Sequence, residues 1–277
     1  MSIQWFPGHM TKAKRAIQEQ LKAVDMVIEC RDARIPIASS NPMIEELIQH
    51  KPRLIVLTKR DLAESKITDQ WIAHYQEEGI LAIALNVLKD NVISSISKGC
   101  ELAMKPKHER DLKRGIRPRM TRALVVGVPN VGKSTLINRL AHRKVVEVAN
   151  RPGVTMSLKR IRISDKLEVV DSPGLLWPRF EDQLYGIHLA LCSSIKETGY
   201  QIDTIAQYGY DFFKEERPEQ LMEYYHLESL EDLESFYRAL TIRVGQPEDR
   251  GPQLFLRDIQ SHAFGPISWE KPSERTA

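Results

Sequence analysis

Hydrophobic and polar positions are arranged along the first two thirds of the chain in blocks that predict strands and helices by turns. Short apolar runs predict buried strands, and apolar residues spaced three or four positions apart predict amphipathic helices. The strands are expected at 25–30, 54–57, 80–85, 123–127, 158–163 and 167–171. The helices are expected at 10–24, 41–49, 67–78, in a stretch that ends near 104, and at 133–141. This alternation is typical of the α/β class, with a mostly parallel sheet covered by helices on both faces.

From about residue 181 onward the strand patterns stop and helical patterns follow. They cover 181–196, 201–216, 218–225 and 229–240, and a final segment spans 251–263. We therefore expect two domains, an α/β domain at 1–178 and an all-helical C-terminal domain at 179–277. Within the first, residues 105–122 are charged and contain Pro106 and Pro118, which predicts a basic linker, or a basic helix followed by a linker.

Composition excludes several classes of protein. The 277 residues are 42% hydrophobic and 28% charged, which is typical of a packed globular protein. No apolar run approaches the roughly 20 residues of a membrane span, and the first residues lack the apolar centre of a signal peptide. The three cysteines lie far apart, so their spacing predicts neither a zinc finger nor a disulfide framework. We expect a cytoplasmic monomer that does not bind membranes.

Charge is segregated along the chain although the net charge is only +3. Residues 105–163 carry 16 basic and 3 acidic side chains, whereas residues 164–277 carry 11 basic and 21 acidic ones. A basic middle segment indicates a polyanionic partner, either a nucleotide or a nucleic acid.

The segment Gly127–Ser134 is a complete GxxxxGK[ST] phosphate-binding loop (P-loop) between a predicted strand and a predicted helix. Its glycines allow backbone N–H groups, including those of Val131 and Gly132, to surround phosphates at the positive end of the helix. Lys133 is expected to neutralise the β- and γ-phosphates, and the Ser134 hydroxyl to bind Mg²⁺, with Thr135 next in the nucleotide-binding loop. The alternative is a glycine turn in an ordinary strand–helix unit.

A DxxG motif follows at the end of the last predicted strand, 38 residues after the P-loop lysine. We expect the Asp171 carboxylate to hold Mg²⁺ through water and the Gly174 N–H to contact the γ-phosphate. Between the two motifs lies Arg151–Thr155, in which the Thr155 hydroxyl suits a second Mg²⁺ contact. A plain turn before the next strand is the alternative for that loop.

The motif that would read a guanine base lies upstream of the P-loop, at Thr58–Asp61. The Asp61 carboxylate can accept hydrogen bonds from the guanine N1–H and amino group, and the Lys59 stem can stack on the base. Asn86 and Val87 end the next predicted strand, where a backbone amide could contact the guanine oxygen. The order of these motifs is a rearrangement of the usual one, which is physically allowed because the termini of compact domains often lie close together.

Over essentially its full length the chain resembles the circularly permuted GTPases of the ribosome biogenesis GTPase A (RbgA/YlqF) family. The motifs that carry the resemblance are Trp5–Met10, Asp32–Pro36, Thr58–Asp61, Gly127–Thr135, Arg151–Thr155 and Asp171–Pro178. The resemblance implies Mg²⁺-dependent GTP hydrolysis coupled to late maturation of the bacterial large ribosomal subunit. Thr58 departs from the pattern, because many GTPases carry an Asn there that braces the P-loop, and the change predicts a looser nucleotide pocket.

The catalytic residue is not evident from the motifs. Leu175 occupies the position where Ras-like GTPases carry a water-positioning Gln, and its side chain cannot form a hydrogen bond. His9, in a turn that begins the N-terminal helix, is our candidate, and a locally packed histidine is the alternative. Asn130 matches a position that coordinates K⁺ in potassium-activated GTPases, and a turn-stabilising Asn is the alternative there.

Two other functions compete with the GTPase. An ATP-using P-loop enzyme conflicts with Thr58–Asp61, and an RNA-binding module with a vestigial nucleotide site conflicts with the complete set of phosphate and Mg²⁺ residues. An NTPase that acts on another RNA, or that hydrolyses little on its own, stays open. We expect ribosomal RNA phosphates to contact the basic segment through Lys105, Lys107, Arg110, Lys113, Arg114, Arg117, Arg119 and Arg122.

Overall fold

The computed structural model describes residues 8–48, 51–117, 119–143, 160–172, 174, 180, 182–230 and 232–272, with the side chains of residues 8–14 and 16 left aside. Thr155 and Leu175, which the sequence analysis singled out, lie outside these residues.

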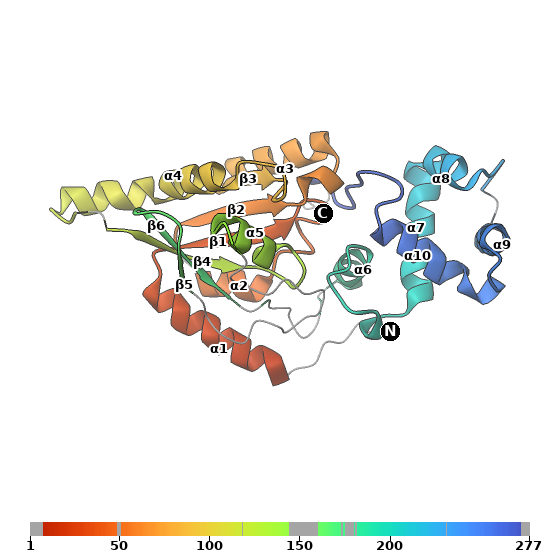
Figure 1. The fold of residues 1–277 in the computed structure, drawn as a ribbon, viewed down its shortest axis with the longest axis horizontal. Helices are drawn as coiled ribbons and strands as arrows, with labels where there is room; N and C mark the ends of the chain where they lie inside the picture. The colour runs from red at the N-terminus through yellow and green to blue at the C-terminus, as the bar shows by residue number, and fades with distance from the viewer. Residues whose placement is uncertain are drawn as a thin grey trace.

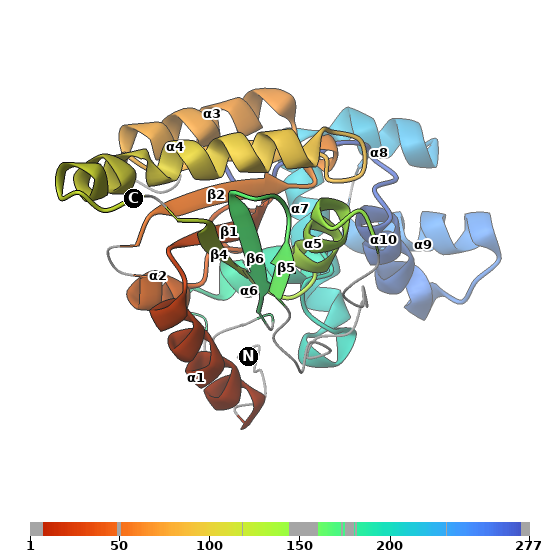
Figure 2. The same ribbon diagram turned by 60° about the vertical axis from the view of Figure 1, so that its left-hand side comes forward.

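A six-stranded sheet forms the centre of the first domain (Figures 1 and 2). Its strands are β1 (Met26–Asp32), β2 (Arg53–Thr58), β3 (Leu81–Leu85), β4 (Thr121–Val126), β5 (Arg160–Arg162) and β6 (Leu167–Asp171). They lie in the order β3-β2-β1-β4-β6-β5, and all neighbours are parallel except β5, which pairs antiparallel with β6 at the edge. The predicted α/β class with a mostly parallel sheet is therefore confirmed.

Helices cover both faces of the sheet, as expected for parallel strands that are apolar on both sides. They are α1 (Gly8–Ala23), α2 (Pro42–Ile48), α3 (Ser65–Glu77), α4 (Val92–Lys113) and α5 (Lys133–Leu140). Apolar side chains of α1 and α2 pack on β1, β4 and β6, and those of α3 pack on β2 and β3. The side chains of α4 and α5 belong to the larger core on the other face, and Figure 2 shows α1 and α2 across the sheet from α4.

Helix α4 continues through the first half of the basic segment, so residues 105–113 are helical and are not a linker. Pro106 lies inside the helix, although proline usually ends one. The residues around it are mostly strong helix formers, which favours continuation. The C-terminal end of α4 projects beyond the sheet, on the side opposite the helices of the C-terminal part of the chain (Figure 1).

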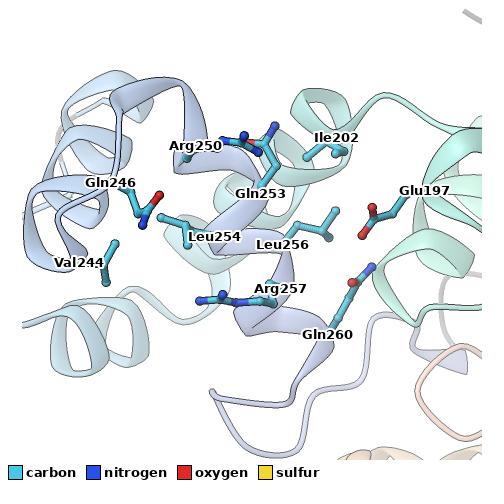
Figure 3. Close-up of a pocket in the computed structure, with 10 residues that line it drawn as sticks. All are labelled: Glu197, Ile202, Val244, Gln246, Arg250, Gln253, Leu254, Leu256, Arg257 and Gln260. Carbon is cyan, nitrogen blue, oxygen red and sulfur yellow. The ribbon is translucent and has the colours of Figure 1, made fainter.

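The second region is built from α6 (Gln183–Leu191), α7 (Ile202–Glu216), α8 (Pro218–Tyr225), α9 (Leu233–Val244) and α10 (Gly251–Gln260). Its core is aromatic, since the rings of Phe213, Tyr225, Phe236 and Phe255 lie within contact of one another. A hollow of about 630 Å³ lies beside α10 and is lined by long polar side chains, including Arg250 and Arg257 (Figure 3). None of the helices that the structure describes is long and apolar enough to cross a membrane.

Helix α6 ends at Leu191, well before residue 196, where periodicity predicts its end. Ser193 adopts a left-handed conformation with φ 58°. The Ser194 N–H then donates to the Leu189 carbonyl at 2.7 Å, and the Ser193 N–H donates to the Ala190 carbonyl at 3.0 Å. This is the Schellman arrangement, which ends a helix through backbone bonds and here does so without the usual glycine.

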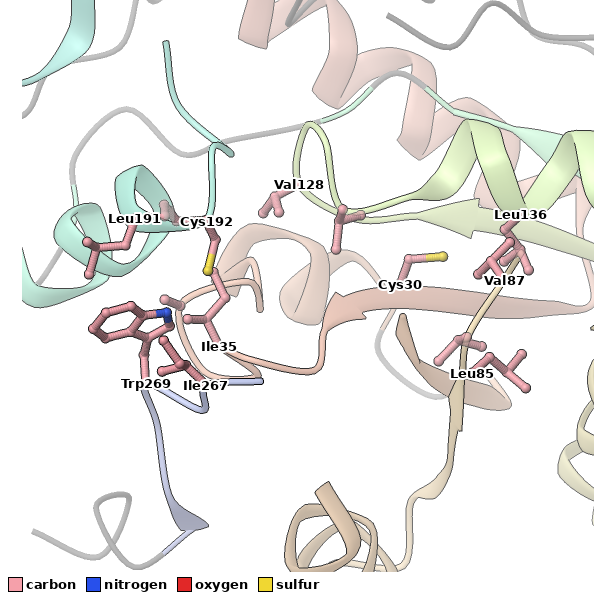
Figure 4. Packing of buried hydrophobic residues seen from close by; sticks show 14 of the residues in the cluster. Cys30, Ile35, Leu85, Val87, Val128, Leu136, Leu191, Cys192, Ile267 and Trp269 are labelled. Carbon is pink, nitrogen blue, oxygen red and sulfur yellow. The ribbon is translucent and has the colours of Figure 1, made fainter. Parts of the chain in front are cut away.

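The chain after α10 returns to the sheet domain, which the division at residue 178 does not anticipate. The Trp269 N–H donates to the Arg34 carbonyl at 2.9 Å, and the Trp71 indole N–H donates to the Glu270 carbonyl at 3.1 Å. The buried Glu270 carboxylate accepts the Ala38 N–H at 3.0 Å and lies 2.9 Å from the ring of His188 in α6. Figure 4 shows how Ile35, Cys192, Ile267 and Trp269 converge where the tail, α6 and the sheet domain meet.

Candidate nucleotide-binding site

The base motif, the P-loop and the start of the DxxG motif lie at one edge of the sheet. Parallel strands end at the same edge, and ligands of open α/β sheets bind there. β2 ends at Thr58 and β3 at Leu85, just before Asn86. β4 ends before Gly127, and β6 ends at Asp171. The strand order brings these ends together although the base motif precedes the P-loop in the sequence.

The P-loop has the backbone geometry of an anion site. Gly127 has φ +148°, and a Cβ at this position would lie 2.5 Å from the Cys30 carbonyl oxygen, so a side chain cannot be accommodated. Gly132 has φ +102° and caps α5, which begins at Lys133. Asn130 is also left-handed, with φ 57°. Successive backbone N–H groups in such a turn, at the positive end of a helix, bind phosphate.

The P-loop lysine is buried within its own loop. Its Nζ donates to the Val128 carbonyl at 2.7 Å. Burial lowers the pKa of Lys133 to about 8, while Cys30 and Asp171 act in the opposite direction. A Cβ built on Gly174 would lie 3.1 Å from the Lys133 Nζ, so the backbone of the DxxG glycine passes beside the ammonium group. Lys133 and Gly174 can therefore face the same phosphate.

The oxygen ligands in the described part of the site fit Mg²⁺. Asp171 is 1% exposed at the end of β6 and attracts Lys133, and Ser134 follows Lys133 in the first turn of α5. A carboxylate and a hydroxyl are hard ligands of the kind that Mg²⁺ takes, together with waters and phosphate oxygens. Among the described residues no group of three or more His, Cys, Asp or Glu could hold a metal.

Thr58 joins the base motif to the P-loop. Its hydroxyl oxygen lies 2.5 Å from the carbonyl oxygen of Val131, 73 positions along the chain, and 3.0 Å from that of Arg31. The side chain is fully buried. A hydroxyl thus joins Thr58 to the P-loop at the position where other GTPases carry an Asn amide, and the expected looser nucleotide pocket stays a prediction.

The residues expected to read the base lie on the loops after β2 and β3. Asp61 is exposed in the short helix η1 (Arg60–Leu62), and Lys59 precedes it with a left-handed φ of 56°. Asn86 is buried, and its side chain accepts the N–H groups of Leu88 and Lys89 at 3.0 and 3.2 Å. Its own N–H donates to the Asp90 carboxylate at 2.8 Å, so this amide is engaged within the loop. Val87 is also buried, with 5% exposure.

Asn130 contacts the helical region, which sequence reasoning did not anticipate. Its amide group donates to the carbonyl of Ser193, in the turn after α6, at 2.9 Å. The P-loop therefore touches both the base motif, through Val131 and Thr58, and the helical region, through Asn130.

Sequence reasoning also missed Asp32 and Arg34 as members of the site. Both are buried at the end of β1, and the Asp32 carboxylate forms ion pairs with Arg34 at 2.7 Å and with Lys59 at 2.9 Å. The sequence did carry a signal for this pair, since two oppositely charged residues lie within the short apolar segment Asp32–Pro36. Charges in such a segment indicate a buried ion pair, because buried charges require partners.

His9 lies in the first turn of α1, and its side chain is outside the described residues. The 16-residue helix spans about 24 Å and the seven-residue strand β1 about 23 Å. Helix α1 ends shortly before β1 begins, and side chains of its second half, including Ile17 and Leu21, pack on the sheet. The catalytic role of His9 stays a prediction.

Comparison with known proteins agrees with this geometry. Residues 122–222 match the family described as "50S ribosome-binding GTPase". The chain is 43% identical to "Ribosome biogenesis GTPase A" of Bacillus cereus, over 99% of this chain and 95% of the relative. It is 33% identical to "Mitochondrial ribosome-associated GTPase 1" of Bos taurus, over 97% of this chain and 88% of that protein. The crystal structure of GNP-bound YlqF from T. maritima superposes with a TM-score of 0.65 at 25% identity, covering 94% of this chain and 98% of that one.

Proposed function

The chain belongs to the ribosome biogenesis GTPase A family, and we propose from this premise that it hydrolyses GTP when docked on the large ribosomal subunit late in the maturation of that subunit. The bond between Thr58 and Val131 is the observation that carries the nucleotide assignment, because it joins a guanine-reading motif to a P-loop in one site. The names of the relatives support the ribosomal partner. On the same ground we propose a cytoplasmic location.

Each site residue has a defined task in this proposal. Lys133 and the N–H groups of the P-loop, including those of Val131, Gly132 and Thr135, hold the phosphates. Ser134, Thr155 and Asp171 would hold Mg²⁺ together with the phosphates, and the ion would neutralise the charge that develops during hydrolysis. The Gly174 N–H, beside Lys133, binds the γ-phosphate.

The base and the monovalent cation have their own contacts. Asp61 accepts hydrogen bonds from the guanine edge, and the Lys59 stem stacks on the ring. A backbone N–H of the loop at Asn86 and Val87 contacts the guanine oxygen. The Asn130 amide nitrogen is held by Ser193, so its side-chain oxygen is the atom that would take K⁺ beside the phosphates.

Hydrolysis with and without ribosomal subunits tests the proposal. The isolated protein is expected to turn over slowly, because Leu175 replaces the water-positioning Gln of Ras-like GTPases. Contacts of that kind are worth about 10³–10⁵ in rate, so a large stimulation by purified large subunits is expected. Single-turnover hydrolysis of labelled GTP measures it, with small subunits as the matched control. Equal rates with both subunits would refute the docking model.

The outer end of α4 and the turn that follows it form the surface that we propose for ribosomal RNA. Of the eight basic residues expected to contact phosphate, three are paired with carboxylates of the chain itself, namely Lys107 and Arg119 with Asp25, and Arg122 with Glu168. The other five are exposed and form no ion pair with the described residues: Lys105, Arg110, Lys113, Arg114 and Arg117. We propose these five as the phosphate contacts.

Neutralising three of these residues is expected to weaken binding to the large subunit and to reduce its salt dependence. Each phosphate contact contributes about one unit to the slope of log K against log salt, so the triple variant Lys113→Gln, Arg114→Gln and Arg117→Gln should lower the slope by about two to three. Sedimentation binding over a salt series measures the slope. The control variant, Lys66→Gln, Lys98→Gln and Lys196→Gln, removes the same charge at exposed positions elsewhere and should leave the slope within about one unit. A slope that both variants lower equally would remove α4 from the interface.

A further inference from the structure

The Asp32 carboxylate is the centre of a buried ion cluster at the end of β1. It has no solvent exposure, and it accepts the Arg34 N–H at 3.1 Å, the Arg34 Nε at 2.9 Å and the Arg34 Nη2 at 2.7 Å. Its Oδ2 also accepts the Lys59 Nζ at 2.9 Å. Two cations therefore share one carboxylate, and one of them belongs to the base motif.

The charges of this cluster depend on one another. Burial alone would raise the pKa of Asp32, but Arg34 and Lys59 outweigh it and hold the pKa far below its usual value. Asp32 is therefore ionised at any physiological pH. Arg34 supplies a guanidinium fork that fixes the plane of the carboxylate, which leaves Oδ2 directed at Lys59.

Lys59 is held at both ends as a result. Its backbone is left-handed at the entry to η1, and its ammonium is paired with Asp32 while the side chain stays 26% exposed. A free lysine stem samples many rotamers, and the pairing selects those that keep the ammonium at the end of β1. Binding a ring against a stem that is already ordered loses less entropy than ordering the stem on binding.

We propose that Asp32, oriented by Arg34, is a positioning residue that orders Lys59 for binding of the guanine ring. This inference rests on the proposed role of Lys59 at the base. Asp32 acts through Lys59 and contacts neither the phosphates nor the base.

Arg34 extends the cluster toward the C-terminal part of the chain. Its Nη2 lies 3.5 Å from the carbonyl of Cys192, after α6, and its Nη1 lies 3.4 Å from the ring of His262, after α10. Its carbonyl accepts the Trp269 N–H. The residue that orients Asp32 therefore also contacts the helical region and the tail.

A double-mutant cycle on GDP affinity tests the inference. Lys59→Met keeps the stem and removes the ammonium, and Asp32→Asn keeps the shape and removes the charge. Each single variant is expected to weaken binding of a fluorescent GDP analogue about tenfold. The double variant should bind the analogue no more than about twofold more weakly than Lys59→Met alone. The losses of the single variants should appear in nucleotide affinity, whereas Glu29→Gln, outside the site, should keep a single-turnover rate within about twofold of the parent at saturating GTP.

Two further variants keep the test decisive. Glu29→Gln disrupts a comparable buried pair on β1, with Arg31 and Arg53, and should lower stability while leaving GDP affinity within about twofold. Lys59→Arg retains a cation for Asp32 and should bind GDP better than Lys59→Met, a comparison that does not require Asp32 to be changed.

The contrary outcomes are distinguishable. Additive losses in the cycle, an equal loss in Glu29→Gln, or no gain from Lys59→Arg over Lys59→Met would overturn the positioning role while leaving Lys59 at the base. Unchanged GDP affinity in Lys59→Met would overturn the positioning role, because the stem would then bind the ring without its ammonium being held. Unchanged GDP affinity in Lys59→Ala, which removes the stem, would overturn the proposed role of Lys59 itself.

Discussion

Replacing His9 by alanine is expected to leave GTP and GDP affinity nearly intact and to remove most of the hydrolysis that the large subunit stimulates. Leu175 cannot orient water, so another group must do so or the ribosome must supply it. His9 lies in the first turn of α1, the helix that ends just before the central strand β1. We expect docking to fix this turn and residues 172–180 in a productive geometry.

The expected role of His9 is positional. The transition state of phosphoryl transfer is loose, so orienting the attacking water contributes more than removing its proton. The loss in the His9→Ala variant should accordingly be a large part of the docking-dependent factor, on the order of 10²–10³. Single-turnover hydrolysis with saturating large subunits measures the rate, and a fluorescent nucleotide measures the affinity.

A second histidine provides the control for this prediction. His74→Ala changes a histidine on α3 that pairs with Glu78, just past the end of the same helix, and it should retain full stimulation. Full stimulation in His9→Ala would instead transfer the catalytic contact to the ribosome or to K⁺, and His9 would then be a residue that only begins the helix.

The sheet and its ligand edge could be predicted because their signals are local. Each buried strand is a short apolar run, and the base motif, the P-loop and the DxxG motif each lie at the end of one, as Asp171 ends β6. Parallel strands then bring separate motifs to one edge without further information. The sequence could not decide whether α4 continues past Pro106. A proline is a strong local signal against a helix, whereas the neighbouring helix-forming residues are only a weak signal for one.

The contacts between distant segments could not be predicted from the sequence. The bond from Asn130 to Ser193 joins a side chain to a backbone carbonyl, which any residue would supply, so the sequence carries no trace of the partner. The tail packs back on the sheet domain through Glu270. The Glu270 carboxylate accepts the N–H groups of Ile37 and Ala38 and contacts the ring of His188. A glutamate near the end of a chain usually lies on the surface, and nothing local marks this one as buried.

Changing Asp61 to asparagine is expected to exchange the preference for guanine nucleotides for a preference for xanthine nucleotides. A carboxylate that accepts both the N1–H and the amino group of guanine recognises two donors on one edge of the base. Xanthine presents a carbonyl in place of the amino group, to which an asparagine amide can donate. Sites built on hydrogen bonds discriminate strongly because the wrong partner leaves polar groups unpaired.

The exchange should amount to at least about 100-fold in the ratio of GDP to xanthosine diphosphate affinity. Asp61 is exposed on η1, so the fold should survive the substitution. Competition of each unlabelled nucleotide against a fluorescent one measures the ratio, and ATP should not compete with the parent protein. Asp69→Asn, an exposed carboxylate on α3, removes the same charge and should keep the preference for guanine. Asparagine is the test residue because it keeps the shape of the side chain and replaces one acceptor oxygen by a donor. If the Asp61→Asn protein still prefers GDP, the base is read by another residue.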